Sequence, residues 1–250
     1  MFISPNWPVP NNIKAFCTTR KGGESKRPFD SFNLATHVED DLLTVLKNRA
    51  LLFEAAHLPA EPIWLNQQHT NKVLAPDASS TFFEPEIADA SWTQAPNTVL
   101  AVMTADCLPI LLTDEAGTCV AAIHAGWKGL ANNVVSETLQ AMPVQNNKLM
   151  AWIGPAISQK HFEVGQDVFD AFVTNSPENA SFFVVKETES NKYFADLPGL
   201  VTAQLNALGV EKVYKSDLCS FEDEEHFYSY RRDGKTGRMA SLIWIEKPTE

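Results

Sequence analysis

Residues Val99–Leu130, with the sequence VLAVMTADCLPILLTDEAGTCVAAIHAGWKGL, decide the fold of this chain. The stretch holds three short apolar runs, Val99–Met103, Leu108–Leu112 and Cys119–Ile123, and turn residues separate them. Short apolar runs rich in Val, Ile and Leu between turn residues are typical of buried β-strands. The stretch therefore predicts three strands at the centre of a sheet.

Polar and reactive residues lie among these predicted strands. Asp106 and Cys107 stand between the first two, and His124 follows the third. A buried polar group without a partner costs about 1–3 kcal/mol, so such residues need a structural or chemical reason. Because Cys and His are also metal ligands and catalytic groups, the sequence predicts that the functional site lies in this stretch.

The stretch ends in a glycine-containing turn, Gly126–Gly129, that leads into a helix predicted over Leu130–Met142. A strand, a glycine turn and a helix direct backbone N–H groups and the positive end of the helix toward the site, which favours an anion. The turn sequence GWKG is not a Walker motif, so it does not identify a phosphate site by itself.

Length and charge limit the classes of protein to consider. A chain of 250 residues can form one large α/β domain or two small ones. We find no internal repeat and no linker composition, so we predict one domain over residues 1–250. The net charge of −11 argues against nonspecific binding to nucleic acid, which needs basic patches.

We expect a cytoplasmic protein that makes no contact with membranes. No apolar run approaches the length of about 20 residues that a membrane span needs. The first residues, MFISPNWPVPNN, lack the basic segment of a signal peptide. The four cysteines are scattered without CxxC spacing, which indicates reduced thiols. The sequence leaves the oligomeric state open.

Other segments predict further elements and possible anion-binding groups. Residues Ile13–Arg20 are typical of a strand. Over Asp40–His57 the apolar residues recur at helical spacing, which predicts an amphipathic helix that packs on a sheet through Leu42, Val45, Leu46, Ala50, Leu51 and Phe53. Residues Phe227–Arg238, with alternating aromatics and the turn DGKTG, predict a hairpin whose return strand is Met239–Ile245. Arginines around this turn could clamp a phosphate or carboxylate, or could form an exposed basic turn.

Seven motifs occur in this order: TTRKGG, LNQQHTNKV, ADASWT, TADCLPILL, HAGWKGL, IGPAIS and FYSYRRDGKTGRMASLI. Together they resemble the laccase-domain, or polyphenol-oxidase-like, YfiH family over nearly the whole chain. The most specific pair is TADC-x-P and HAGW, in which Cys107 and His124 lie seventeen residues apart.

The resemblance implies an α/β (α+β) fold in which mixed β-sheets are sandwiched between helices. It also implies a pocket where His69, Cys107 and His124 gather around a metal ion. The family's motif around the first histidine usually reads QVHG, so Gln68 and Thr70 depart from it. Lys128 stands where the family often has Arg, which keeps the charge but not the bidentate geometry.

Two histidines and one thiolate are one ligand short of a closed structural zinc site, and the open position is typical of catalytic zinc. Such a site also binds copper strongly, so we expect Zn²⁺ with Cu²⁺ as an alternative. The six histidines of the chain are too few for the several copper centres of a true multicopper laccase.

The resemblance implies a purine nucleoside phosphorylase acting on adenosine, inosine, guanosine and S-methyl-5′-thioadenosine, with adenosine deaminase activity. Purine nucleosides and phosphate would then be its small-molecule partners. Asp106 could act as an acid or base, or could orient a ligand histidine. On charge and placement, the candidates for binding phosphate or substrate are Arg20, Asn33, Arg231 and Arg232.

Other classes of protein stay open at this point. Cys107 could be the nucleophile of a metal-free hydrolase with a histidine base. A zinc-stabilised interaction module would use the same ligands without turnover, although structural sites usually have four. The alternative enzyme is a copper-dependent oxidase of phenols, or one that acts on cell-wall precursors.

Overall fold

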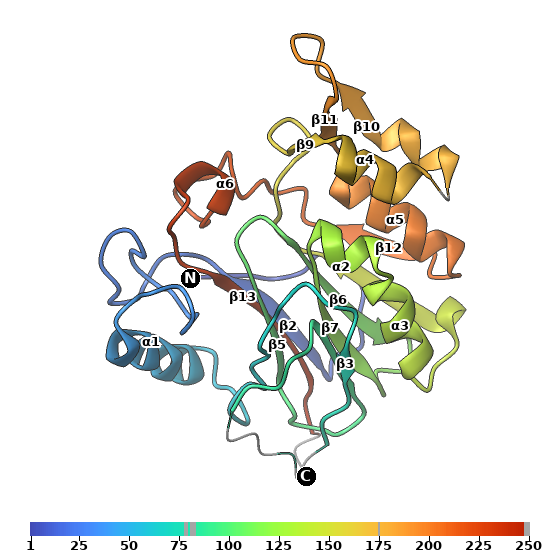
Figure 1. Cartoon of the computed structure of the whole chain (residues 1–250). Coiled ribbons are helices and arrows are strands. Elements are labelled where there is room, and N and C mark those ends of the chain that lie inside the picture. Colours follow the sequence, from blue (N-terminus) through green and yellow to red (C-terminus); the bar gives the residue numbers. More distant parts are fainter. Residues whose placement is uncertain (78–79, 81–83, 175, 248–250) are drawn as a thin grey trace.

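The computed structural model describes residues 1–77, 80, 84–174 and 176–247 (Figure 1). Its largest sheet has six strands in the order β12-β8-β6-β7-β4-β3. The β4-β7, β7-β6 and β6-β8 pairs are antiparallel, and the β12-β8 and β3-β4 pairs at the two edges are parallel. The bounds are β3 Val73–Leu74, β4 Ala90–Thr93, β6 Leu108–Asp114, β7 Val120–Ala125, β8 Leu149–Ile153 and β12 Lys212–Lys215.

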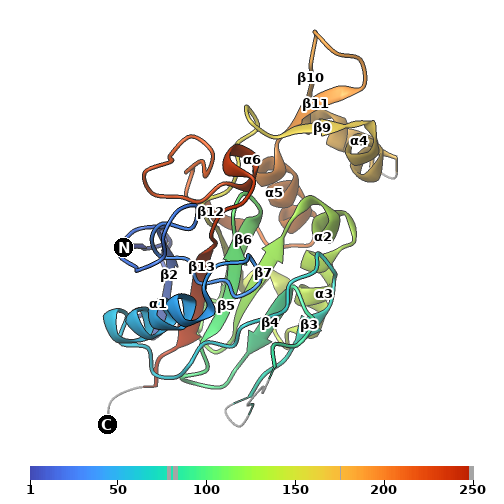
Figure 2. The same cartoon turned by 60° about the vertical axis from the view of Figure 1, so that its left-hand side comes forward.

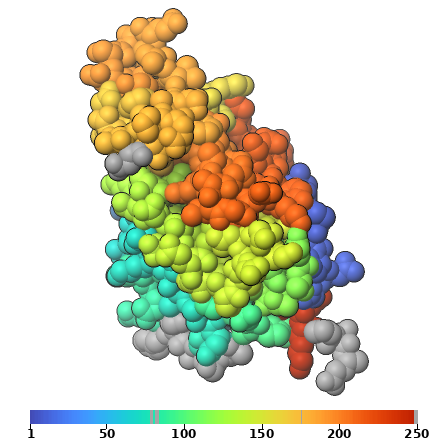
Figure 3. Space-filling view, turned by 90° about the vertical axis from the view of Figure 1, so that its right-hand side faces the viewer, coloured from blue at the N-terminus to red at the C-terminus, as the bar shows by residue number. Residues whose placement is uncertain are grey.

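A second sheet of four antiparallel strands has the order β1-β2-β13-β5. Its strands are β1 Phe2–Ile3, β2 Ile13–Thr18, β5 Leu100–Thr104 and β13 Met239–Ile245. A third, small sheet lies away from these two, at one end of the molecule (Figure 2) (Figure 3). It consists of β10 Phe183–Val185, β11 Lys192–Ala195 and β9 Glu163–Gly165.

The described residues also form six α-helices and two 3₁₀ turns. They are α1 Leu42–Ala55, α2 Trp127–Ala131, α3 Val134–Ala141, α4 Gln166–Val173, α5 Leu197–Ala207 and α6 Tyr230–Asp233, with 3₁₀ turns η1 Asn146–Lys148 and η2 Pro177–Phe182. Helix α1 packs on the four-stranded sheet, and α3 and α5 pack on the six-stranded sheet (Figure 1). None of the helices in the described part of the chain is both long and apolar enough to cross a bilayer.

Alternation along β5 explains how these layers hold together. Leu100 and Val102 point to the core between the two sheets, where they pack with Leu111 of β6. Ala101 and Met103 point the other way, toward the core under α1. Successive side chains of a strand face opposite sides, so one strand serves both cores. The expected mixed sheets between helices are confirmed.

The three strands predicted from Val99–Leu130 are also confirmed. Every residue of β5, β6 and β7 is buried. β6 and β7 form an antiparallel pair, whereas β5 belongs to the neighbouring sheet. Strands covered on both faces have continuous apolar sequences, which is why the runs stand out.

The prediction of one continuous helix over Leu130–Met142 is wrong. The chain forms two helices, α2 and α3, and α2 begins at Trp127. Asn133 between them has φ +66°, a left-handed conformation that Asn tolerates better than most residues. The break turns α3 onto β7 and β4 while α2 stays next to the site.

The helix expected within Asp40–His57 is confirmed as α1, but its predicted apolar face is partly wrong. Asp41 caps it by accepting hydrogen bonds from the backbone N–H and hydroxyl of Thr44. Leu42 and Leu46, expected in the core, are 54% and 47% exposed. The buried positions are Val45, Asn48 and Leu52, because the amide of Asn48 binds the loop of residues 24–33.

The hairpin predicted from Phe227 is wrong. Met239–Ile245 is a strand, but it pairs with β2 and β5, far away in sequence. Phe227 and Tyr228 are both fully buried, so the aromatics do not alternate between two faces. Ser229 then caps the short helix α6 by accepting a hydrogen bond from the backbone N–H of Arg232.

Candidate metal centre and its cavity

The structure brings together three residues that are far apart in sequence. His69, Cys107 and His124 each offer one ligand atom, and these atoms all lie within 4.8 Å of one another. Cys107 directly precedes β6, and Leu108 of β6 pairs with Ala125 of β7, the residue after His124. The antiparallel register therefore places the thiol and this imidazole at the same end of the two strands.

One carboxylate, that of Asp89, holds both histidines. Its Oδ1 lies 2.8 Å from Nδ1 of His124 and accepts a hydrogen bond from the backbone N–H of His69 at 3.0 Å. Its Oδ2 accepts from the backbone N–H and the hydroxyl of Thr70 at 2.6 and 2.7 Å. Because Asp89 occupies Nδ1 of His124, Nε2 is the nitrogen left for a metal ion.

The loop that carries His69 adopts a conformation that Asp89 stabilises. His69 has φ +58°, in the left-handed region, and the backbone N–H of Gln68 also donates to Asp89, at 3.2 Å. Several consecutive N–H groups thus point at one carboxylate. The sequence analysis missed Asp89, although it lies in the motif ADASWT, immediately before β4.

Gly126 allows the three residues to approach one another. A Cβ at this position would lie 2.6 Å from Cε1 of His69 and 2.9 Å from Sγ of Cys107. Real Cβ atoms essentially never show contacts below 3.0 Å, so any side chain here would push the ligands apart. The glycine of the HAGW motif is therefore required for packing.

Burial and nearby charges shift the pKa values of His69 and His124 in opposite directions. Burial lowers the pKa of His69, and the nearby His124 lowers it further. Burial also lowers the pKa of His124, but the charge of Cys107 and the hydrogen bond that His124 donates to Asp89 outweigh it and raise the pKa to about 9. Burial raises the pKa of Asp89, while its hydrogen bond to His124 leads the effects that bring it down to about 2. A metal ion binding at His124 would therefore displace a proton.

The three residues open into a cavity of about 480 Å³. Its wall combines apolar and aromatic side chains with a few polar groups, which is typical of a site for a small molecule. The other residues that line it are His37, Gln67, Met103, Thr104, Ala105, Asp106, Trp127, Ile157, Phe162, Tyr230, Arg231 and Arg238.

Asp106 lies in this wall but binds neither histidine. It has φ +95°, and its carboxylate accepts hydrogen bonds from the hydroxyl of Ser220 and the backbone N–H of Arg231, both at 2.7 Å. Asp106 therefore connects the Cys107 turn to the segment that carries α6. The expectation that it could orient a ligand histidine is corrected, since Asp89 does so.

Arg231 is the one residue of the four expected anion-binding candidates that lines the cavity. Its guanidinium Nη1 donates to the backbone carbonyls of His161 and Glu163, at 3.2 and 2.9 Å. Arg232 lies outside the cavity lining, and its guanidinium donates to the carbonyls of Ser220, Phe221 and Phe227. These arginines hold loops in place.

Arg20 and Asn33 also lie outside the cavity lining. Nε of Arg20 donates to the carbonyl of Asp30 at 2.9 Å, and Nη1 donates to the carbonyl of Glu224 at 3.2 Å. Asn33 is fully buried, and its side chain binds Asp40 and accepts from the backbone N–H of Arg238. Asn33 thus supports the cavity wall from behind.

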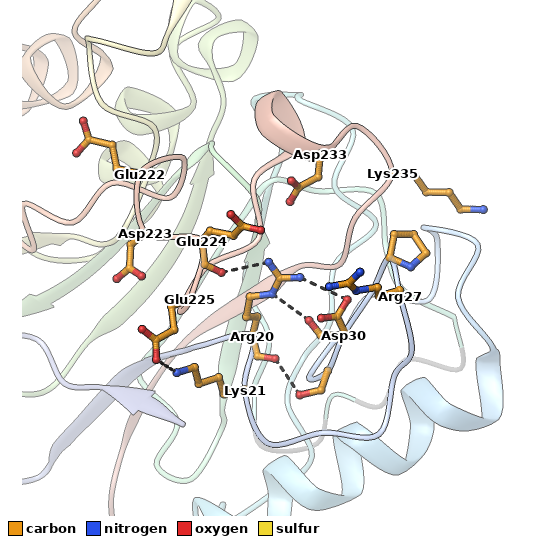
Figure 4. Close-up of a pocket in the computed structure, with 12 residues that line it drawn as sticks. Arg20, Lys21, Arg27, Asp30, Glu222, Asp223, Glu224, Glu225, Asp233 and Lys235 are labelled. Carbon is orange, nitrogen blue, oxygen red and sulfur yellow. Dashed lines mark hydrogen bonds and ion pairs between the residues drawn. The ribbon is translucent and has the colours of Figure 1, made fainter.

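A larger hollow of about 1050 Å³ contains Arg20 but none of the three clustered ligands. In Figure 4, Lys21 forms an ion pair with Glu225 and Arg20 forms one with Asp30, whereas Lys235 points away from these carboxylates. The hollow is an open groove lined by six carboxylates and four cations. The smaller cavity, with its clustered ligands, is the candidate site.

The fold and the site define a mixed α/β protein with a group of three metal-ligating side chains at the end of its largest sheet. The chain belongs to the laccase-like family described as multi-copper polyphenol oxidoreductase laccase, whose model matches residues 14–246. The sequence resemblance is thereby confirmed.

Curated relatives match almost end to end. The chain is 46% identical to the purine nucleoside phosphorylase of Haemophilus influenzae, over 98% of this chain and 99% of that protein. It is 43% identical to the purine nucleoside phosphorylase YfiH of Escherichia coli, over 97% of this chain and 98% of the other.

Two solved structures share the fold. The match to a Neisseria meningitidis protein has a TM-score of 0.93 and 46% identity, covering 98% of this chain and 99% of that chain. The match to YlmD of Geobacillus stearothermophilus has a TM-score of 0.92 and 29% identity, covering 98% and 96%.

Proposed function

We propose that this chain is a purine nucleoside phosphorylase that acts in the cavity next to His69, Cys107 and His124. The observation that carries the proposal is the convergence of these three residues on one small-molecule cavity. The names of the two curated relatives support the same activity, since both are called purine nucleoside phosphorylases and this chain matches each of them over nearly its whole length.

We assign the three ligands to Zn²⁺. The donor set fits this ion, because imidazole nitrogen and thiolate sulfur are its common ligands and Asp89 fixes one imidazole from behind. When bound with an open position, zinc lowers the pKa of a bound water and polarises a substrate atom. Copper would also bind strongly to this donor set, so copper in a preparation would not indicate oxidase chemistry.

Phosphorolysis would need the cavity to hold a nucleoside beside an anion. An oxygen of phosphate forms a bond to the anomeric carbon, the bond from that carbon to the purine nitrogen breaks, and the base leaves with the electron pair and takes up a proton. Trp127, Phe162 and Tyr230 offer flat apolar surfaces against which a purine could pack. Asp106 is the carboxylate of the wall, and we assign it the proton transfer.

The same cavity could accept adenosine, inosine, guanosine and S-methyl-5′-thioadenosine, because they share the purine and the ribose. We include deamination of adenosine in the proposal, since a water activated near the purine carbon that bears the amine would release ammonia. In the described residues one group of three or more metal-ligating side chains is found. A four-copper oxidase would need several such groups.

The experiment is a product assay on the purified protein with adenosine, with and without phosphate, before and after chelation. We expect adenine release that depends on phosphate, loss of activity on chelation and rescue by zinc. Inosine formation without phosphate would report deamination. Activity that survives chelation but not alkylation would favour the cysteine hydrolase. A folded, zinc-loaded protein that releases neither adenine nor inosine would overturn the proposal.

A further inference from the structure

Arg238 is the more buried of the two arginines in the cavity wall, and part of its guanidinium keeps free donors. Its backbone N–H donates to Oδ1 of the buried Asn33 at 3.0 Å, and its Nη1 donates to the carbonyls of Thr236 and Gly237 at 2.8 and 3.0 Å. Within the described part of the chain, Nε and Nη2 donate to no other group, and no carboxylate forms an ion pair with this guanidinium. Two donors of one planar fork therefore remain for a ligand.

This arrangement costs stability unless something else offsets it. Burial lowers the pKa of Arg238, because the charged guanidinium is partly removed from water, while the negative charges of Cys107 and Asp106 act in the opposite direction. Asp106 lies in the same wall but forms no ion pair with Arg238, since its carboxylate accepts hydrogen bonds from Ser220 and the backbone N–H of Arg231. A buried charge without a direct partner is unusual. A bound anion would complete the pair.

His37 lies in the wall of the same cavity. Burial lowers its pKa, and the positive charges of Arg238, Arg49 and His124 lower it further. A ring N–H of His37 can donate a hydrogen bond. His37 and Met103 also line an adjoining pocket of about 260 Å³, in which Arg49 and Trp64 stand. The guanidinium groups of Arg238 and Arg49 are thus both close enough for their charges to act on His37.

The other arginines of the region are placed differently. Arg231 also lines the cavity and its Nη1 likewise donates to two carbonyls, but its side chain is exposed and its charge acts on the carboxylate of Glu163. Both terminal nitrogens of Arg232 donate hydrogen bonds, Nη1 to a carbonyl and Nη2 to a carbonyl and to Asp233. The expected anion-binding role of the basic turn therefore falls to its third arginine, Arg238.

We propose that inorganic phosphate binds in the corner of the cavity between Arg238 and His37. Nε and Nη2 of Arg238 donate to two phosphate oxygens, and a ring N–H of His37 donates to a third. This proposal rests on the proposed phosphorylase function for its role in the reaction, since it places the anion in the same cavity as the nucleoside. The presence of the anion site itself does not depend on that function.

The test measures phosphate binding and catalysis separately on the zinc-loaded full chain. Binding of inorganic phosphate alone is followed by ³¹P line broadening, and the KM for phosphate and for adenosine are measured by product release. The variants are Arg238→Gln and Arg238→Lys. The control is Arg27→Gln, which removes an exposed cation from the groove of Figure 4, outside the cavity.

We expect Arg238→Gln to weaken phosphate binding and raise the KM for phosphate about 10- to 100-fold, the size of effect of lost hydrogen bonds to a charged group. The KM for adenosine should stay within about twofold. Arg238→Lys should recover only part of the loss, because an ammonium cannot bind two oxygens with one fork. Arg27→Gln should bind phosphate as the wild type does.

Phosphate binding that is unchanged in Arg238→Gln, or absent in the wild type at millimolar phosphate, would overturn the inference. If phosphate binds through Arg238 but no base is released from any nucleoside, the anion site stands and the phosphorylase proposal falls. If base release requires phosphate but the KM for phosphate is the same in Arg238→Gln as in the wild type, the phosphorylase proposal stands and the anion site at Arg238 falls. Competition by ribose 1-phosphate or adenosine monophosphate distinguishes free phosphate from a phosphate carried by a larger ligand.

Discussion

Two hollows of the described structure differ in character, and the smaller one holds the candidate site. The open groove around Arg20 has about twice the volume of the cavity around Cys107. In the groove, cations and carboxylates pair with each other, as Lys21 does with Glu225. In the cavity, three side chains that could hold a metal ion and the guanidinium of Arg238 face one space, in which Asp106 is the one carboxylate of the lining. The gathering of these side chains marks the candidate site better than volume does.

The largest expected effect comes from Cys107→Ala, which removes one of the three ligands. We expect turnover to fall by at least the about 10²–10³-fold that follows the loss of one stabilising group at a catalytic centre. Bound zinc, measured by metal analysis after gel filtration, should fall to a trace. Full activity in a folded variant would contradict the contrast between the two hollows.

Asp89→Asn tests whether the carboxylate behind the histidines belongs to the site. The amide keeps the shape but loses the charge that both His124 and the His69 loop use. Loss of such a supporting group typically costs about 10- to 100-fold in metal affinity. Competition with a zinc chelator of known affinity measures it. An affinity equal to that of the wild type would remove Asp89 from the site.

Gly126→Ala should have an intermediate effect. The added methyl group would crowd Sγ of Cys107 and the ring of His69, and inserting a methyl into a packed region costs about 1–3 kcal/mol. We expect zinc affinity to fall about tenfold by the same chelator competition. Gly165→Ala is the control for the methyl group, because Gly165 has φ −91° and its Cβ position approaches only the side chain of Asp167, outside the cavity. Equal affinities in both variants would show that crowding at Gly126 is tolerated.

Lys21→Gln is expected to have the smallest effect, because it changes the groove and leaves the cavity intact. Its partner Glu225 is exposed, and surface ion pairs of this kind contribute little. Turnover of adenosine should stay within about twofold of the wild type. A loss as large as that of Cys107→Ala would mean that the groove takes part in catalysis.

The sequence predicted the parts of the fold that local patterns determine. β5, β6 and β7 were predictable because strands buried on both faces have continuous apolar runs. The hairpin at Phe227 failed because β13 finds its partners in β2 and β5, and such long-range pairing leaves no local signal. The break at Asn133 depends on one left-handed residue, which composition does not reveal.

The residues of the candidate site were likewise predictable only in part. The resemblance identified His69, Cys107 and His124, and the structure brings them together. Asp89 escaped the sequence analysis because a lone carboxylate beside small residues has no distinctive spacing. Arg20 and Arg232 were selected on charge alone, and charge does not reveal whether a guanidinium is already bound to carbonyls. Only three-dimensional contacts separate a free arginine from an engaged one.

The shared carboxylate of Asp89 has a consequence for the speed of metal uptake. It fixes the His69 loop and the His124 ring in the folded chain itself, so the donors are already gathered when an ion arrives. The ordering entropy of these residues belongs to the folding reaction and is not repeated at each encounter. Zinc should therefore associate at a rate set by diffusion and by the shedding of its own hydration water, with no slow rearrangement of the chain.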